Sequence, residues 1–342
     1  MFPKVSVVVL NFNTRKLLEE LLPKLLETVY ENLEIVVADN ASRDGSADFV
    51  TDLFPQIKVL RLDKNLGYAG GYNKSLSLLE ADYFVLLNSD VEVTPNWITP
   101  MVDMAEKDKN IAAIQPKILD YKDRTHFEYA GAAGGHIDYL GYPFCKGRVF
   151  DFVEIDSGQY DQPEEIFWAS GAAMFVRASV YKEVGGLDEH FFAHMEEIDL
   201  CWRMKSWGYK IYNCPQSRVY HIGGGTLSQQ SSRKTFLNFR NGLRLLIKNC
   251  PSGKLWSVYF YRLCLDGLAG LQFLSKGKVS DVIAIVKAHW SVFGSLHTWL
   301  RFRKENKQMI WTELKNTPGF YSRSVVWQFF GKKHRRFSDL DR

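Results

Sequence analysis

The densest cluster of acidic residues is Glu196-Glu197-Ile198-Asp199, at the start of a helix predicted over 195–207. A helix dipole stabilises carboxylates in the first turn, so the cluster has a purely structural interpretation. A carboxylate that points into a cleft can instead take the proton of an attacking hydroxyl group. Asp199 can pair with Arg203, four residues further along the helix. Glu196 and Glu197 are therefore the candidates for a general base.

A second cluster, Asn88-Ser89-Asp90, follows the apolar run 83–87. Mg²⁺ takes few protein oxygens and completes its shell with phosphate oxygens and water, so an acid at the end of a buried strand suits it. A turn made of Asn, Ser and Asp is the structural alternative. His221 stands shortly before Gly223-Gly224-Gly225-Thr226, and its imidazole is a candidate to complete a metal shell with Asp90.

Weaker signals concern nucleotide and phosphate binding. Asp39 ends the apolar run 33–38, where it could accept a hydrogen bond from a base or ribose or serve as an ordinary helix cap. The glycines of Asn65–Asn73 would let the backbone approach a ligand, or only permit a tight helix entry. Their spacing is wrong for G-x-G-x-x-G, and no G-K-[ST] of a Walker A loop occurs. Arg240-Asn241 could contact phosphate or be a surface charge.

Alternating strands and helices are expected to position these residues. Strands are predicted over 4–10, 33–38, 57–62, 83–87 and 111–115, and helices over 14–28, 45–54, 68–79 and 95–107. This alternation predicts an α/β fold with a parallel sheet, which binds ligands beyond the carboxyl ends of its strands. The polar clusters Asn11–Asn13, Asp39–Asn40 and Asn88–Asp90 all fall at such ends. Loops and short antiparallel strands are expected over 119–165, and a short strand over 210–213.

The 342 residues are 46% hydrophobic, 24% charged and 14% aromatic, which is typical of a globular chain and excludes a disordered or fibrous one. The net charge of +4 hides an asymmetry, because residues 1–230 carry −11 and residues 231–342 carry +15. An acidic body with a basic C-terminal region favours an anionic partner for that region. The five cysteines include no C-x-x-C pair, and a strand-like run begins at Lys4, so a cytoplasmic chain without a signal peptide is expected.

The C-terminal region contains two predicted amphipathic helices. Residues 255–274 are mostly apolar, but Arg262 and Asp266 would each cost about 2.5–3.5 kcal/mol inside a bilayer. Since they are four residues apart, they can pair on one face of a helix that lies on a membrane or on the body. A second helix is expected over 279–300. Basic residues among Trp and Phe, as far as Lys332–Arg336, fit an anionic membrane surface, with a solvated basic bundle as the alternative.

Eight segments together resemble glycosyltransferase family 2, the inverting enzymes with a GT-A fold, over about residues 4–245. In sequence order they are V-S-V-V-V-L-N-F-N, D-N-A-S-R-D-G-S, N-L-G-Y-A-G-G-Y-N, L-L-N-S-D, S-G-A-A-M-F-V-R, G-G-L-D-E-H-F-F, E-E-I-D-L-C-W-R and the histidine before the glycines. Within the family the chain looks most like the bacterial rhamnosyltransferase branch of envelope polysaccharide synthesis. The resemblance implies a catalytic domain over 1–230, with a Rossmann-like, mostly parallel sheet flanked by helices, and a helical C-terminal extension over 231–342.

The resemblance also implies a reaction and its partners. The donor would be a nucleoside-diphosphate sugar, either dTDP-rhamnose or a UDP-hexose, with Mg²⁺ or Mn²⁺ as cofactor. The acceptor would be a saccharide or a lipid-linked saccharide at the inner face of the cytoplasmic membrane, and no nucleic acid would take part. The catalytic base would be Glu197, with Glu196 as the alternative.

The remaining roles are carried over by position. The metal would be held by Asp90 with His221. The acceptor site would be bordered by Trp168, Ser170 and Gly171, and phosphate would be contacted by Arg240 and Asn241. The nucleotide sugar would be bound by Leu10, Asn11, Phe12, Asp39, Asn65, Gly67, Gly71, Asn73, Asn88, Ser89 and Asp90.

Two residues depart from the family pattern. Asn88 replaces the first Asp of the D-x-D motif, which removes one charge from the metal site, and Glu197 stands where Asp is commoner. Asn88 is the reason to keep a catalytically inactive sugar-nucleotide-binding or scaffold protein as the alternative. A sugar nucleotidyltransferase is disfavoured because Asn11–Thr14 is not a Gly-rich, Arg-containing loop.

Overall fold

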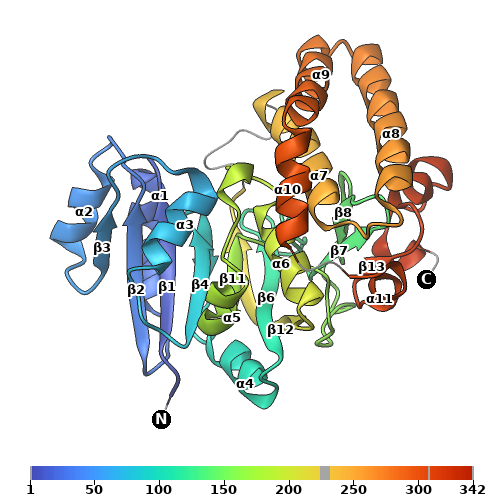
Figure 1. The fold of residues 1–342 in the computed structure, drawn as a ribbon. Helices are drawn as coiled ribbons and strands as arrows, with labels where there is room; N and C mark the ends of the chain where they lie inside the picture. The colour runs from blue at the N-terminus through green and yellow to red at the C-terminus, as the bar shows by residue number, and fades with distance from the viewer. Residues whose placement is uncertain (1, 224–231, 307–308, 341–342) are drawn as a thin grey trace.

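The computed structural model describes residues 2–223, 232–306 and 309–340. An eight-stranded sheet with the order β3-β2-β1-β4-β11-β6-β12-β5 forms its centre (Figure 1). The strands are β1 (Val5–Asn11), β2 (Leu33–Asp39), β3 (Lys58–Arg61), β4 (Tyr83–Asn88), β5 (Val91–Val93), β6 (Ile111–Asp120), β11 (Ala173–Arg177) and β12 (Lys210–His221). The first four strands in this order are parallel, as predicted, whereas β11 enters antiparallel between β4 and β6 and makes the sheet mixed.

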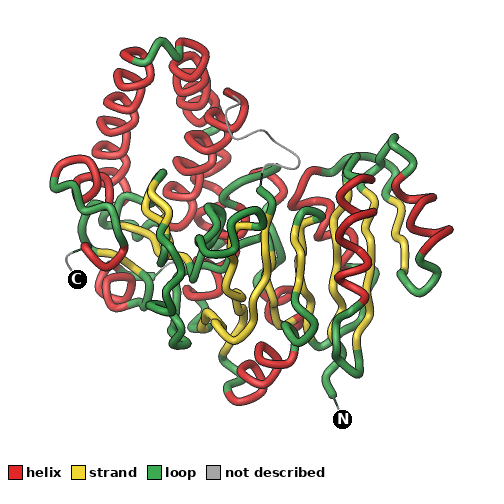
Figure 2. The backbone as a smooth tube through the Cα atoms, turned by 180° about the vertical axis from the view of Figure 1, so that it is seen from behind, coloured by secondary structure: helices red, strands yellow, loops and turns green. Residues whose placement is uncertain are grey.

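Helices cover both faces of this sheet because apolar side chains alternate along its strands. Val5, Val7 and Val9 of β1 face one apolar cluster, and Val8 faces another. The first cluster packs against α1 (Arg15–Leu26), α2 (Ser46–Leu53) and α4 (Thr99–Lys107). The second packs against α3 (Gly67–Leu76), α5 (Ala178–Glu183) and α6 (Glu196–Ser206). Seen from behind, Figure 2 shows the strands side by side with helices lying across them.

The C-terminal helices pack beside this α/β body. They are α7 (Ser232–Asn249), α8 (Leu255–Ser275), α9 (Val279–Gly294), α10 (Leu296–Glu305) and α11 (Trp311–Asn316). Among the described residues, no single helix is long and apolar enough to cross a membrane. The bent pair α9–α10 meets these criteria of length and composition only when its two helices are taken together. Figure 1 shows α8 and α9 as a hairpin that projects from the body on the side where β1 ends.

A second, five-stranded sheet has the order β10-β9-β8-β7-β13. It contains the short antiparallel strands expected after residue 119, namely β7 (Gly135–Asp138), β8 (Pro143–Cys145), β9 (Arg148–Val149) and β10 (Phe152–Val153). Its last strand, β13 (Phe320–Tyr321), comes from near the C-terminus and pairs in parallel with β7. The segment around the basic run Lys332–Arg336 therefore folds back onto the body, where Phe337 packs against Phe144 and Tyr160.

Several predicted elements have different bounds in the structure. The helix predicted over 95–107 begins only at Thr99, and the strand predicted over 111–115 continues to Asp120. The strand predicted over 210–213 continues to His221, because an irregularity between Cys214 and Arg218 lets the pairing with β6 resume beyond Pro215. The helix predicted over 279–300 is instead broken into α9 and α10, which bend by 63°. At that break Ser295 Oγ donates a hydrogen bond to the carbonyl of Ser291, a local bond that competes with the helical pattern beside Gly294.

Candidate active site

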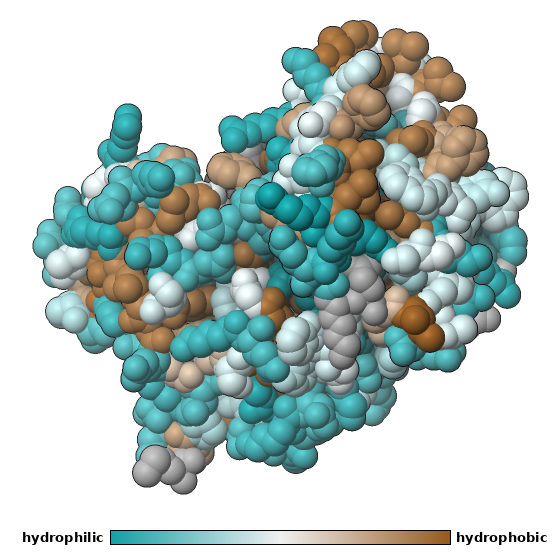
Figure 3. Space-filling view, viewed as in Figure 1, coloured by the Kyte–Doolittle hydropathy of each residue, from teal (hydrophilic) through white to brown (hydrophobic). Residues whose placement is uncertain are grey.

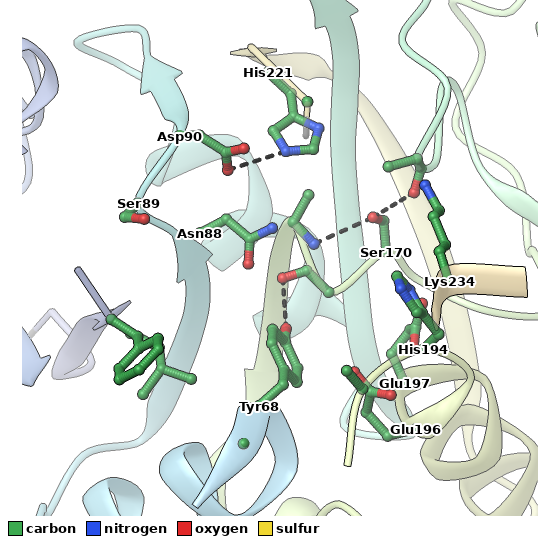
Figure 4. A pocket seen from close by; sticks show the side chains of 18 of the residues that line it. Tyr68, Asn88, Ser89, Asp90, Ser170, His194, Glu196, Glu197, His221 and Lys234 are labelled. Atoms are coloured by element: carbon green, nitrogen blue, oxygen red, sulfur yellow. Dashed lines mark hydrogen bonds and ion pairs between the residues drawn. The ribbon is translucent and has the colours of Figure 1, made fainter. Parts of the chain in front are cut away.

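A cavity of about 380 Å³ lies at the edge of the main sheet where β1, β4 and β12 end. Helices α3, α6 and α7 contribute their first turns to it, so backbone N–H groups and polar side chains converge there. Twelve of the residues predicted from the sequence line it: Leu10, Phe12, Asn65, Gly67, Asn88, Ser89, Asp90, Ser170, Gly171, Glu196, Glu197 and His221. In Figure 4, Asp90 and His221 lie at one end of this cavity and Glu196 and Glu197 at the other.

The first functional group of the cavity is a chain of three buried side chains. His221 Nε2 lies 3.1 Å from Asp90 Oδ1, and His221 Nδ1 lies 3.1 Å from Glu128 Oε2. Burial opposes the charge on the imidazole, but the neighbouring Asp90 and Glu128 outweigh it and raise the pKa of His221 to about 10. Glu128 is itself oriented by the backbone N–H of Ala130, which donates to its Oε2. His221 is thus held between two carboxylates.

A hard divalent cation bound here would replace the proton between Asp90 and His221, because an imidazole ligates a metal only in its neutral form. In an octahedral shell with bonds of about 2.1 Å, neighbouring ligand atoms lie about 3 Å apart, which matches the distance between Asp90 Oδ1 and His221 Nε2. Glu128 occupies the position of the carboxylate that commonly orients a metal-ligating imidazole. No group of three or more His, Cys, Asp or Glu side chains that could hold a metal ion is found in the described residues. A bound cation would therefore take its other ligands from water or from a phosphate-bearing substrate.

The second functional group is the pair Glu196 and Glu197 in the first turn of α6. Each side chain has a buried Oε2 atom with no hydrogen-bond partner among the described residues. Burial raises the pKa of Glu197 to about 7, and burial together with the charge of Glu197 raises the pKa of Glu196 well above its usual range. An unpartnered carboxylate with a pKa near neutrality is suited to accept a proton from a substrate.

Asp199, the third acid of that cluster, has a structural role. Its carboxylate accepts hydrogen bonds from Arg203 Nε at 2.8 Å, Lys248 Nζ at 2.8 Å and Asn249 Nδ2 at 2.8 Å. The pairing with Arg203 is the one expected from their spacing. Because Lys248 belongs to α7, Asp199 ties α6 to the C-terminal helices.

The loop that leads into α6 is strained and is held by α7. Phe192, His194 and Met195 all have positive φ angles, of 67°, 70° and 74°, which is unfavourable for residues with a side chain. Asn241 Nδ2 donates hydrogen bonds to the carbonyls of Phe191, Ala193 and His194, at 3.0, 2.8 and 2.8 Å. These bonds compensate part of the strain, and the loop in turn places Glu196 and Glu197 at the cavity.

Gly67 connects the same loop to α3. Its φ of +73° favours glycine, and a Cβ atom there would lie 2.7 Å from the ring of Phe192. The next residue, Tyr68, donates its backbone N–H to the carbonyl of Phe192 and its hydroxyl to the carbonyl of Gly171. Gly67 thus allows α3 and the loop before α6 to approach each other closely at the edge of the cavity.

The other predicted residues lie behind the lining of the cavity and support it. Asn11 Nδ2 donates to Asp39 Oδ1 at 2.7 Å, and both side chains are buried. Asn73 donates a hydrogen bond to the carbonyl of Leu187 and accepts one from the hydroxyl of Tyr181. The indole of Trp168 donates to the carbonyl of His136. Gly71 packs against Leu10, whereas Arg240 and Asn241 donate to the carbonyl of Phe191. Of the glycine run after His221, Gly224-Gly225-Thr226 lies outside the described residues.

Several lining residues were missed by the sequence analysis: Asn40, Tyr68, Glu128, His194, Arg233 and Lys234. Glu128 lies in the segment without periodicity. Arg233 and Lys234 lie on α7, which falls in the predicted helical C-terminal region but was not predicted as a separate helix. The Asp39–Asn40 pair was noticed, but the structure places Asn40 at the cavity, where its Oδ1 accepts from the N–H of Leu66. His194 faces Lys234, and burial together with that charge lowers the pKa of His194 to about 4.

The fold defines a class of protein, the glycosyltransferases with a GT-A fold. Two solved structures share the fold. GalNAc-T7 with UDP, GalNAc and Mn²⁺ gives a TM-score of 0.56 at 18% identity, over 72% of this chain and 48% of that one. The mannosyltransferase PcManGT from Pyrobaculum calidifontis, with GDP-Man and Mn²⁺, gives a TM-score of 0.51 at 14% identity, over 89% of this chain and 85% of that one.

The model of the family described as glycosyl transferase family 2 matches residues 6–185, and the chain belongs to that family. An uncharacterized glycosyltransferase of Haemophilus influenzae is 30% identical over 310 residues, 85% of this chain and 93% of that protein. The N-acetylglucosaminyl-diphospho-decaprenol L-rhamnosyltransferase of Mycobacterium tuberculosis is 26% identical over 233 residues, 64% of this chain and 75% of that protein. The chain is therefore an enzyme of the transferase class, which transfers a sugar in glycan synthesis.

Proposed function

We propose that the chain is an inverting glycosyltransferase that moves a sugar from a nucleoside diphosphate to a hydroxyl group of a saccharide or lipid-linked acceptor. The observation that carries this proposal is the arrangement of the cavity. The unpartnered carboxylates of Glu196 and Glu197 share it with the Asp90–His221–Glu128 chain, so a base and an electrophilic end face the same space. In a single displacement one of these carboxylates accepts the proton of the acceptor hydroxyl, and the anomeric centre is inverted.

In this proposal Glu197 accepts the proton of the acceptor hydroxyl as that oxygen bonds to the anomeric carbon and the bond to the diphosphate breaks. Burial keeps the pKa of Glu197 close to neutrality, and Glu196 is the alternative base. Asp90 and His221 would hold Mg²⁺ or Mn²⁺, which when bound supplies positive charge to the departing diphosphate. Arg233 and Lys234, which line the cavity from α7, add positive charge on the protein itself.

The binding roles follow the lining of the cavity. Leu10, Phe12 and Asn65 would contact the nucleotide, with Asn11 and Asp39 supporting them from behind. Ser170 and Gly171 would border the acceptor, with Trp168 behind. Arg240 and Asn241 would act on the donor phosphate through the loop they hold. In this view residues 1–230 form the catalytic domain, and residues 231–342 form a basic region that completes the site and faces the membrane.

Donor and acceptor are proposed from the family. The similarity to the mycobacterial L-rhamnosyltransferase supports dTDP-rhamnose as the donor and a prenyl-diphosphate-linked saccharide as the acceptor, with a UDP-hexose as the second donor to test. A lipid-linked acceptor would place the enzyme at the inner face of the cytoplasmic membrane, in the synthesis of an envelope polysaccharide.

The test is transfer by the purified chain. Thermal shifts with dTDP-, UDP- and GDP-sugars, with and without Mn²⁺, would identify the nucleotide, and release of nucleoside diphosphate would then measure turnover. Asp90→Ala is expected to lose the Mn²⁺-dependent shift, whereas Asp123→Ala, at an exposed carboxylate, serves as the matched control. NMR of the product would report the anomeric configuration. A folded chain that binds a sugar nucleotide but transfers to no acceptor, with or without Mn²⁺, would favour the inactive binding protein.

A further inference from the structure

The hairpin formed by α8 and α9 exposes an unusually apolar surface. Eleven of the 23 exposed large hydrophobic side chains in the described residues lie on these two helices. They are Trp256, Phe260, Tyr261, Leu268, Leu271 and Leu274 on α8, and Val279, Ile283, Val286, Trp290 and Phe293 on α9. Figure 3 shows hydrophobic side chains gathered over the upper part of this hairpin. A concentration of this kind marks a surface that is covered by something when the protein works.

The charges of α8 point inward, which reverses the usual arrangement of a surface helix. Arg262 and Asp266 are its only charged residues, and both are buried. Arg262 Nε lies 3.0 Å from Asp266 Oδ1, and the guanidinium stacks 3.7 Å from the centre of the Tyr142 ring. Soluble helices expose their charges and bury their apolar residues, so α8 is built to meet an apolar medium on its outer side.

These buried charges also fix the hairpin to the body. Arg262 Nη1 donates to the carbonyl of Leu140 at 3.2 Å. His289 of α9 lies 3.2 Å from Asp266 Oδ2, and Asp281, also of α9, accepts a hydrogen bond from Thr235 of α7. The apolar surface is therefore carried on a positioned element that projects from the molecule.

The charge around the hairpin selects the partner. Lys276 and Lys278 are exposed at its tip, and Lys287 is exposed on α9. Residues 231–342 carry a net charge of +15. Trp and Tyr side chains with lysines beside them are the composition that binds at the boundary between lipid headgroups and acyl chains, and anionic lipid attracts each nearby lysine. A second copy of this chain would bring the same positive charges together and be repelled.

We infer that the α8–α9 hairpin docks onto an anionic lipid bilayer, with its exposed apolar side chains inserted to a depth of about 5–10 Å. The docking rests on the proposed function in one respect only: the bilayer would present the lipid-linked acceptor on the side of the molecule that carries the hairpin. Because the hairpin projects from the edge at which β1 ends, docking would turn the cavity toward the membrane surface (Figure 1).

The test measures binding of the full chain to vesicles, without sugar nucleotide or acceptor. Flotation with phosphatidylcholine vesicles that contain phosphatidylglycerol is expected, with weaker binding to phosphatidylcholine alone. The double variant Leu271→Glu/Ile283→Glu removes two inserted side chains from exposed positions, so binding should fall by about 100-fold without loss of fold. Lys276→Gln/Lys278→Gln should weaken binding by roughly 30-fold. Leu53→Glu, at a position as exposed as Leu271 but on α2, is the matched control and should bind like the wild type.

The outcomes separate the partners. Equal flotation of the wild type and of Leu271→Glu/Ile283→Glu would overturn the inference. A concentration-dependent dimer that the same variant dissociates, with no flotation of the wild type, would identify a second copy as the partner and also overturn it. Thermal melting of each variant confirms the fold. Since transfer to a water-soluble acceptor does not need the bilayer, a wild type that does not float with anionic vesicles but still transfers the sugar would contradict the docking and leave the proposed function standing.

Discussion

Glu197→Gln replaces the proposed base by a side chain of the same size that carries no charge and accepts no proton. The substitution keeps the packing of the first turn of α6. It is expected to lower kcat by about 10²–10⁴-fold, the usual contribution of a general base, while the donor still binds. In the wild type kcat should rise tenfold per pH unit up to an apparent pKa of about 7, which belongs to the Glu196–Glu197 pair.

The same substitution is expected to stabilise the fold at alkaline pH. The pKa of Glu197 in the folded state, about 7, is higher than its usual value of 4.5, so between these values the folded state binds a proton that the unfolded state has lost. The free energy of unfolding therefore falls as the pH rises from 4.5 to 7, which is the cost of ionising Glu197 in the folded state. Above pH 7 this cost is at most about 3 kcal/mol. Glu197→Gln removes it, so the melting temperature at pH 8 should rise by up to about 4 °C in a chain of this size, and the gain should vanish toward pH 4.5.

Thermal melting over about pH 4.5–8.5 and initial-rate kinetics over about pH 5.5–8.5 check the two parts of this prediction. Glu196→Gln is the matched control, since it removes the other carboxylate of the pair and should retain most of the transfer activity. Near wild-type turnover in Glu197→Gln would refute the assignment of the base. A melting temperature at pH 8 equal to that of the wild type would refute the argument from burial.

Three further outcomes are expected. Asn241→Ala removes three hydrogen bonds from the strained loop before α6, so it should lower the melting temperature and reduce kcat at least tenfold. An unchanged kcat would refute the positioning role. Glu128→Gln should weaken Mn²⁺ binding by about 10–100-fold in a titration followed by electron paramagnetic resonance, and wild-type affinity would argue against His221 as a ligand. Gly67→Ala should destabilise the fold by about 1–3 kcal/mol in urea unfolding, because its Cβ meets Phe192; Gly253→Ala, where a Cβ meets no neighbour, should cost less.

The parallel half of the sheet could be predicted because its information is local. Runs such as 4–10 and 83–87 are apolar and β-branched or aromatic, and polar residues end them, so the strands and their carboxyl ends were predicted within one or two residues. The acidic cluster at the start of α6 was located for the same reason. Helical spacing alone distinguished Asp199, which can pair with Arg203, from the two candidate bases, and the structure contains the Asp199–Arg203 pair.

The rest of the site depends on contacts between distant parts of the chain. Asp90 and His221 are 131 residues apart in sequence, and nothing near Glu128 indicates that it lies against the same imidazole. Asn241 has the composition of a phosphate contact, yet its amide is directed to carbonyls about 50 residues earlier. Such pairings are determined by tertiary packing, which sequence periodicity does not report.

The parallel pairing of β13 with β7 has a consequence for synthesis of the chain. The N–H groups of Val325 and Phe337 donate to Asp138 and Glu154, partners that precede them by 187 and 183 residues. At about 5–20 residues per second a ribosome needs roughly 10–40 s to make the intervening chain. During that time one edge of β7 has no strand beside it, and Asp138 and Glu154 each lack one backbone donor. The nascent protein therefore has an interval in which a chaperone or a premature partner strand can act on this edge, and the interval closes only when residues 320–337 are delivered.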